Sequence, residues 1–336
     1  MINWAKGITA RYYGAFVDPK TWLDTSTFEV TGGSVKYSDD GSYQSADLNC
    51  RGFSPNEELW VRIYLDARQN GDGELVPLFT GLTSVSDVSY NGRIDSETVQ
   101  CYSVLAPADK VLLPLGWFLS SGSYGADAIK DLLTDVIPAP IVIEGESPYI
   151  TSNIIAESNE TNLSMVAKIL KAINWRLKIS GDGTVRLMPQ ASSPVAMFDS
   201  DNNDVVGLNV TIKRDWYGVP NVFRAVSGGT MSIARDEDPD SMFSIPNRGR
   251  EIWMEETNCT MNDGEKIAEY AERRLREEQN IYRTISYSRR FDPNVDVSDL
   301  VIIKYPEINS TGIFQVTSQS LTLGYGGEVS EEVIGI

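Results

Sequence analysis

The chain has 336 residues, of which 47 are acidic, 29 basic and none histidine, so its formal charge at pH 7 is −18. Without histidine, a Ser-His-Asp triad, a Cys-His pair and an imidazole-ligated metal are all excluded. The acidic excess opposes tight binding to nucleic-acid phosphates, which depends on clustered Lys and Arg. These features favour a structural subunit of an assembly over an enzyme.

Length and composition predict a folded protein of two to three domains, because a single core rarely extends beyond about 150 residues. The chain is 41% hydrophobic and 23% charged. We expect neither secretion nor membrane spanning, because no basic start leads into an apolar run and no stretch of about 18 apolar residues occurs. Cys50, Cys101 and Cys259 are far apart and odd in number, which favours reduced structural thiols.

Residues 1–115 are predicted to form a compact antiparallel barrel or sandwich, because β-branched and aromatic runs alternate with turn signals. Residues 59–65 and 75–81 flank Asn70-Gly71, the residue pair preferred in tight hairpin turns. Strand 28–31 is expected to end at Gly32-Gly33, and Asn91-Gly92 is a second turn signal. The remaining predicted strands are 35–37, 84–90 and 98–105.

Residues 116–200 are predicted to form an inserted α+β module. Apolar residues at helical spacing predict helices over 126–136 and 162–174. Strict alternation over 175–179, a Gly181-Asp182-Gly183 turn and a return over 184–188 predict a hairpin. The module therefore differs in character from the β-rich region before it.

Residues 201–336 are predicted to be a second β-rich domain, with strands at 205–213, 221–226, 282–290, 300–305 and 312–323. Asn262 and Glu265 fit a capping box for a helix on which Ile267, Ala271 and Leu275 lie one turn apart. Residues 235–250 are expected to be an exposed loop. The predicted fold class is α+β, mainly β, with two β-barrel-like tube domains and an inserted α+β module.

Several motifs carry candidate chemistry, but each has a better structural interpretation. The segment 66–72 resembles a calcium loop, yet Arg68 and Pro77 occupy ligand positions, so a hairpin turn is favoured. The four acids within 236–240 are read as a solvated loop, and the basic run 273–276 as a salt-bridged helix face. Four tryptophans are assigned to core or interface packing: Trp60, Trp175, Trp216 and Trp253.

No catalytic, cofactor-binding or metal-binding residue is therefore predicted. There is also no Walker loop and no GxGxxG motif, so nothing indicates a nucleotide site or another cofactor. What remains open is carboxylate chemistry, such as a glycosidase pair, and metal binding through oxygen ligands, because neither requires histidine.

The order of elements resembles the phage tail hub proteins, the late-control-protein-D and contractile-baseplate-hub group. The resemblance rests on residues 78–83, on Trp175-Arg176-Leu177 with 183–189, and on a closing series. That series comprises residues 271–276, 282–287, Asp292-Pro293, 297–303 and 312–318. The family often has Gly where Ser298 stands in this chain.

The resemblance implies a homotrimer in which two tube domains per chain give a pseudo-sixfold ring with no catalytic site. Such a ring joins a tail tube to a central spike and lets DNA pass. Expected partners are a tail tube or distal tail protein, a central spike or tail fibre protein, and a tape measure protein. The expected location is the virion tail or baseplate, after assembly in the host cytoplasm. Specific nucleic-acid binding is not expected, so the channel should be acidic or neutral.

Two other function classes remain open. The 32 aromatic residues and many hairpins also suit a carbohydrate-binding or adhesin-like β protein, which a glycan array would detect. A carboxylate-dependent cell-wall glycosidase is the third alternative, and zymography would detect it.

Overall fold

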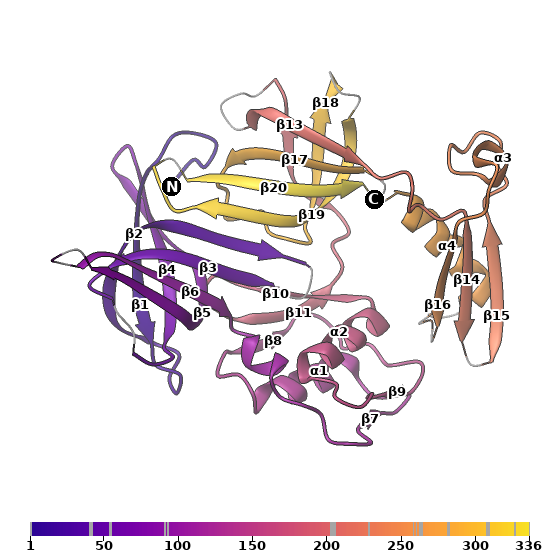
Figure 1. Ribbon diagram of the computed structural model, residues 1–336, viewed down its shortest axis with the longest axis horizontal. Coiled ribbons are helices and arrows are strands. Elements are labelled where there is room, and N and C mark those ends of the chain that lie inside the picture. Colours follow the sequence, from indigo (N-terminus) through magenta and orange to yellow (C-terminus); the bar gives the residue numbers. More distant parts are fainter. Residues whose placement is uncertain are drawn as a thin grey trace.

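The computed structural model shows a mainly β protein of α+β class, as predicted (Figure 1). It describes residues 2–335 except 40–42, 54–55, 91, 93, 202–205, 228, 258, 260, 262–264, 281–282, 307–309 and 326, and only the backbone of 94–96 and 208. Within these residues, one 12-stranded sheet is accompanied by three small sheets.

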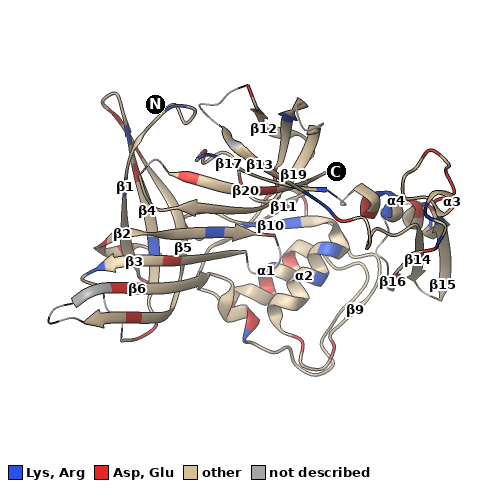
Figure 2. Ribbon diagram, turned by 45° about the horizontal axis from the view of Figure 1, so that its top comes forward, with Lys and Arg blue, Asp and Glu red and all other residues tan. Residues whose placement is uncertain are grey.

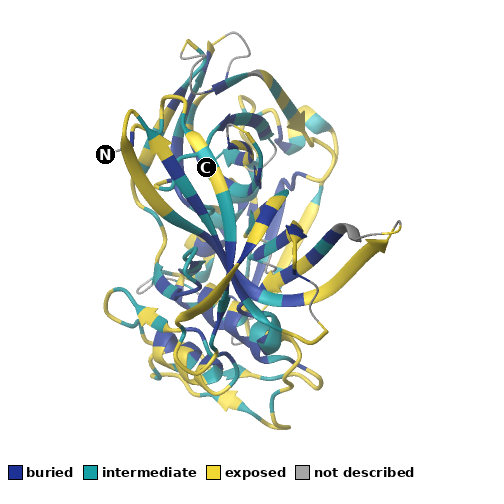
Figure 3. Cartoon of the chain, turned by 90° about the vertical axis from the view of Figure 1, so that its left-hand side faces the viewer, coloured by how far each residue is buried: buried dark blue, intermediate teal, exposed yellow. Residues whose placement is uncertain are grey.

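The first barrel is formed by six antiparallel strands, and pairing of the first strand with β2 closes it. Alternation fills its interior, since Val61, Ile63 and Leu65 are fully buried. Figure 3 shows buried and exposed positions alternating along strands of the protein. The Asn70-Gly71 turn is confirmed, because both residues have positive φ, 51° and 91°. In spatial order the strands are β1 (Thr9–Val17), β4 (Trp60–Gln69), β5 (Asp72–Tyr90), β6 (Ile94–Ser103), β3 (Gln44–Arg51) and β2 (Asp24–Ser38).

Two predicted strand ends in this barrel are wrong. β2 continues through Gly32-Gly33, just before which its register with β3 slips by one residue. Gly33 has φ 128°, and a Cβ there would lie 2.1 Å from the carbonyl oxygen of Asp47. The bulge lies at Thr31, between Val30 and Gly32, and the two glycines do not end the strand. β5 likewise unites segments 75–81 and 84–90, and Asn91 of the second turn signal lies outside the described residues.

The middle of the chain has both predicted helices, α1 (Gly125–Thr134) and α2 (Asn162–Ile173). α2 begins at a capping box between Thr161 and Ser164, and it ends at Asn174, whose φ of 52° suits a helix C-terminus. The predicted hairpin is also present, as β10 (Trp175–Ile179) and β11 (Val185–Pro189). The other elements are η1 (Ala106–Asp109), β7 (Phe118–Leu119), β8 (Ile141–Ile143) and β9 (Ile154–Ile155).

A second set of six strands continues the large sheet and forms a second barrel-like unit around Ile285, Val301, Ile303, Val316 and Val333. Its β20 was not predicted. The strands are β13 (Val206–Arg214), β17 (Arg283–Arg290), β20 (Glu328–Gly335), β19 (Ser310–Thr322), β18 (Leu300–Tyr305) and β12 (Pro194–Asp199).

Between β13 and β17 the chain forms a small outer module at the right of Figure 1, in which a three-stranded sheet packs on one helix. The expected exposed loop at 235–250 is partly wrong, because Phe243 and Ser244 are buried beside a short helix. Asn262 of the predicted capping box lies outside the described residues. The elements are β14 (Val222–Ser227), β15 (Thr230–Arg235), α3 (Ile245–Arg248), β16 (Trp253–Thr257) and α4 (Ile267–Asn280).

Candidate functional site

The most extensive candidate site is a polar sheet face that crosses both barrels. β19 of the second barrel pairs with β2 of the first, placing Ser318, Ser320 and Thr322 opposite Ser38, Lys36 and Ser34. Residues directly opposite one another in an antiparallel pair project to the same side of the sheet. The outward side chains therefore form one continuous surface from β3 to β17.

We call this surface the hydroxyl face. Of its fifteen side chains nine are hydroxyls, three are carboxylates and two are cations, so it is almost uncharged for its size. Its members follow from the strand registers and are Ser34, Lys36, Ser38, Ser45, Asp47, Asn49, Ser286, Ser288, Arg290, Ser318, Ser320, Thr322, Glu328, Ser330 and Glu332.

The charges of the hydroxyl face are dispersed and partly paired, and Figure 2 shows them as isolated positions on β2, β3 and β20. Lys36 Nζ lies 3.3 Å from Asp47 Oδ2, with about half of each side chain exposed. The carboxylate of Glu332 accepts hydrogen bonds from Ser286 Oγ at 3.1 Å and Ser318 Oγ at 3.5 Å. The face is hollowed by about 640 Å³ around these residues. Such a surface has no cation cluster with which to hold a polyanion.

Directly beneath the hydroxyl face lies a buried ion pair between Arg289 of β17 and Glu331 of β20. Arg289 Nη2 is 2.5 Å from Glu331 Oε2, and both side chains are almost fully buried. Glu331 also accepts hydrogen bonds from the Tyr287 hydroxyl and from Gln319 Nε2, the latter at 2.7 Å. Burial and the Glu331 carboxylate raise the pKa of Tyr287 well above its usual value. This network fixes β17, β19 and β20 relative to one another.

The β10–β11 hairpin inserts its turn against the first barrel. The carbonyl of Gly181 accepts a hydrogen bond from Thr80 Oγ1 at 2.8 Å. The carbonyl of Asp182 accepts from Arg62 Nη2 at 2.9 Å and Trp22 Nε1 at 3.0 Å. A Cβ on Gly181 would lie 1.9 Å from the carbonyl oxygen of Pro77, so only glycine fits this close approach.

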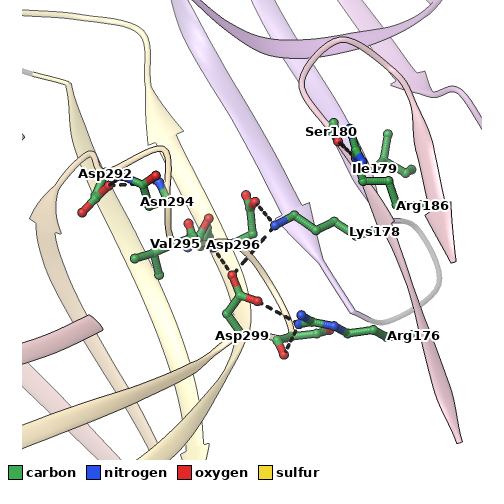
Figure 4. A network of polar contacts seen from close by, with 12 residues as sticks. Arg176, Lys178, Ile179, Ser180, Arg186, Asp292, Asn294, Val295, Asp296 and Asp299 are labelled. Carbon is green, nitrogen blue, oxygen red and sulfur yellow. Dashed lines mark hydrogen bonds and ion pairs between the residues drawn. The ribbon is translucent and has the colours of Figure 1, made fainter. Parts of the chain in front are cut away.

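The same hairpin is held by the second barrel through β10 (Figure 4). Arg176 Nη1 lies 2.8 Å from Asp299 Oδ1 and donates to the Ser298 carbonyl at 2.6 Å. Lys178 Nζ lies 2.5 Å from Asp296 Oδ2; burial raises the pKa of Asp296, although Lys178 opposes the rise. Ser298 has φ 67°, the left-handed conformation that Gly adopts without strain. The hairpin thus bridges the two barrels.

The motifs interpreted as structural are found in structural roles. Segment 66–72 forms the β4–β5 turn, where Arg68 pairs with Asp66. In the acidic segment 236–240, Asp236 accepts hydrogen bonds from Ser241 and Gln279. No group of three or more His, Cys, Asp or Glu residues in the described part of the chain is arranged to hold a metal ion.

The tryptophans divide into two pairs. Trp175 is buried and Trp60 packs against the core of the middle module, which confirms the core assignment for these two. Trp216 and Trp253 are 55% and 46% exposed, so they do not pack in a core, and their packing at an interface stays a prediction. They lie next to or within the small outer module, whose sheet packs on α4.

The basic run on α4 is salt-bridged, as predicted. Arg273 pairs with Glu265 and Glu277, and Arg274 pairs with Glu277 and Glu278. All three cysteines are buried and free, and burial raises the pKa of Cys50 to about 12. Among the described residues no helix has the length and apolar character needed to cross a membrane.

The hydroxyl face was not predicted, although a signal for it is present in the sequence. Serine alternates with buried residues in Ser286-Tyr287-Ser288 and in Ser318-Gln319-Ser320. Period-2 serine marks a strand with one hydrated face. The serine pattern does not reveal the order of the strands in the sheet, and this order joins their hydrated faces into one surface.

Comparison of the sequence with family models and with curated proteins gives no match. Comparison of the structure does. A tail protein from Neisseria meningitidis MC58 is 14% identical with a TM-score of 0.69, over 98% of this chain and 96% of that one. The 43 kDa tail protein of prophage MuSo2 from Shewanella oneidensis is 12% identical with a TM-score of 0.68, over 97% and 98%.

A component of the Escherichia coli type VI secretion system, itself structurally similar to bacteriophage T4 tail proteins, is 7% identical with a TM-score of 0.51, over 98% of this chain and 74% of that one. At these identities the shared property is the fold, which extends over nearly the whole chain. This chain has the fold of phage tail proteins, in agreement with its resemblance to the tail hub family.

Proposed function

We propose that this chain is a non-enzymatic structural hub of a phage or phage-like tail or baseplate. Three copies would form a pseudo-hexameric ring that joins the tail tube to the central spike and lets DNA pass. The observation that carries the proposal is the hydroxyl face, which crosses both barrels without interruption. The proposed domains are 1–115 and 201–336 as tube domains and 116–200 as the inserted module, whose last strand, β12, joins the sheet of the second tube domain.

Geometry supports three copies. Each chain has two barrel-like units that share one sheet, so three chains supply six such units. A closed ring with head-to-tail contacts ends its own growth, which a component of defined size requires. With the hydroxyl face turned inward, the channel wall would be hydrated and nearly neutral.

Charge supports the passage of DNA without a bound state. Lys36 is paired with Asp47, and Glu328 and Glu332 add negative charge. Binding to phosphates grows with the number of cations that contact them, and this face presents few. The proposed neighbours are a tail tube or distal tail protein, a central spike or tail fibre protein, and a tape measure protein. The proposed location is the virion tail or baseplate, after assembly in the host cytoplasm.

Mass and shape test the ring. Light scattering at high protein concentration should give three times the 37.2 kDa of the chain, and electron microscopy should show a ring with a central hole. A strict monomer at high concentration, with no ring in the micrographs, would contradict the proposal. Fluorescent duplex DNA should show no saturable binding, whereas tight binding would contradict the proposed channel wall.

A further inference from the structure

The middle module presents a strand pair whose solvent side is apolar. Residues 111–125 run antiparallel to 148–161, with Leu112 opposite Thr161, Phe118 opposite Ile155, and Tyr124 opposite Tyr149. β7 and β9 are part of this ribbon, at the lower edge of Figure 1 and away from both barrels. A ribbon packed on a core by one side normally has polar residues on the other.

The inward side of this ribbon is apolar, as expected for a side that packs on a core. The side chains that contact the module core are Leu113, Trp117, Leu119, Ile154 and Ala156. Their outward neighbours in the ribbon are therefore free to be polar, since the core is already filled.

The outward side chains are instead large and apolar or aromatic. We call them the ribbon face: Leu112, Leu115, Phe118, Tyr124, Tyr149 and Ile155. Phe118 and Ile155 are 62% and 67% exposed, and Leu115 is 90% exposed. The rings of Tyr124 and Tyr149 stack with centroids 4.3 Å apart, and their hydroxyls lie 2.5 Å from each other. Exposed clusters of this kind mark interaction surfaces, and their aromatic members are typical anchors.

The surroundings of the ribbon face are acidic. Residues 105–160 contain eight acidic side chains and two basic ones, but cations outside this range pair with three of the acids: Arg186 with Glu144, and Lys168 with Glu157 and Glu160. The hydrogen bond between Tyr124 and Tyr149 raises the pKa of Tyr124 most, and the nearby carboxylates of Asp127 and Glu146 add to that effect. Lys110, one of the two bases, is paired with Asp109 at 3.0 Å. The acidic rim of the ribbon face therefore consists of Asp127 and Glu146, beside its two tyrosines.

We propose that the ribbon face binds a polypeptide segment of another protein in which apolar side chains are flanked by Lys or Arg. Charge complementarity selects this partner, because rim charges of opposite sign steer and orient an apolar contact. A second copy of this chain is disfavoured, since its own ribbon face would bring the same acidic rim. An anionic membrane is disfavoured for the same reason. The inference extends beyond the proposed hub function and does not require a trimer.

Two synthetic peptides with identical apolar residues test the proposal, one flanked by lysines and the other by glutamates. Their binding to the full chain is measured by fluorescence anisotropy at low and at moderate salt. We expect the lysine peptide to bind at least about ten-fold more tightly, with the difference narrowing as salt screens the rim. Hydrogen exchange should slow at 111–125 and 148–161. Equal binding of the two peptides would overturn the proposal.

The variant pair Phe118→Ser with Ile155→Ser should weaken binding of the lysine peptide at least about ten-fold, because it removes two exposed anchors and no core contact. Met231→Ser with Ile233→Ser is the matched control, since these side chains are 57% and 40% exposed on a strand of the outer module. It should bind as wild type does. Wild-type affinity in the first variant would contradict the proposal. The proposal would also be contradicted if sedimentation showed that the wild-type chain forms a dimer and that the variant Phe118→Ser with Ile155→Ser does not.

Discussion

Removal of the Glu331 carboxylate should destabilise the second barrel strongly. In Glu331→Ala the guanidinium of Arg289 loses its ion-pair partner while it remains buried, and the donors on Tyr287 and Gln319 lose their acceptor. Breaking a buried pair by removing one partner costs about 3–5 kcal/mol. Hydrogen exchange of the β17 and β20 amides under native conditions measures the opening free energy of this barrel alone, without assuming two-state unfolding of the whole chain.

Two further variants separate the cost of an unpaired charge from the value of the pair. Arg289→Met with Glu331→Leu removes both charges, so most of the stability lost in Glu331→Ala should be recovered. A destabilisation of about 1–3 kcal/mol should remain, because the donors of Tyr287 and Gln319 still lack an acceptor. Lys36→Ala breaks an exposed pair on the same sheet and should cost less than about 1 kcal/mol. The reasoning is refuted if Glu331→Ala costs no more than Lys36→Ala.

Four other changes test separate parts of the structure. Burial alone would raise the pKa of Glu256, but the hydrogen bond and ion pairs that Glu256 makes with cations of α2 and α4 hold this pKa below 4.5. The ionised Glu256 therefore stabilises the fold above about pH 4.5, and this stabilisation is lost as the pH falls. Glu256→Gln should flatten the pH dependence of outer-module hydrogen exchange between pH 3 and 6; an unchanged profile would contradict this. Gly181→Ala places a methyl group against a backbone carbonyl and should cost about 1–3 kcal/mol in urea unfolding, whereas unchanged stability would show that the hairpin can shift. Ser298→Gly relieves a left-handed conformation and should raise the urea midpoint, by up to about 1 kcal/mol of stability, and a lower midpoint would count against strain there. Ser288→Lys with Ser330→Lys adds cations to the hydroxyl face and should create DNA binding. The logarithm of the association constant should fall by about 0.9 per unit of log salt concentration for each phosphate contacted, and a salt-independent affinity would contradict the electrostatic argument.

The elements predicted correctly are those specified by neighbouring residues. The β4–β5 turn depends on Asn70-Gly71, and α2 depends on apolar residues three and four apart. Leu300–Tyr305 is a strand with the predicted bounds, because its β-branched and apolar run is bounded by polar turns. In each case the determining contacts lie within about twenty residues, which a sequence pattern can represent.

The elements predicted incorrectly depend on distant partners. Gly32-Gly33 was interpreted as a strand end, yet the carbonyl of Asp47 on the neighbouring strand is what requires glycine there. β20, which was not predicted, has the sequence Glu-Val-Ser-Glu-Glu-Val-Ile-Gly. One of its acidic residues, Glu331, is buried because Arg289 lies opposite on β17. A partner 42 residues away in sequence is invisible to local periodicity.

The hydroxyl face and the bridging hairpin together connect the fold to the proposed ring. A ring of three chains closes only if the angle between the two barrels of each chain is fixed, since a flexible joint would allow open oligomers of several sizes. In this chain two independent sets of contacts hold the two barrels together. The β2–β19 ladder makes the sheet continuous, and the β10–β11 hairpin is bound at its turn by Arg62 and along β10 by Asp296 and Asp299. Because these contacts lie within one chain, the angle between its two barrels is fixed before assembly. Subunit association therefore does not have to offset the entropy cost of ordering the barrels relative to each other.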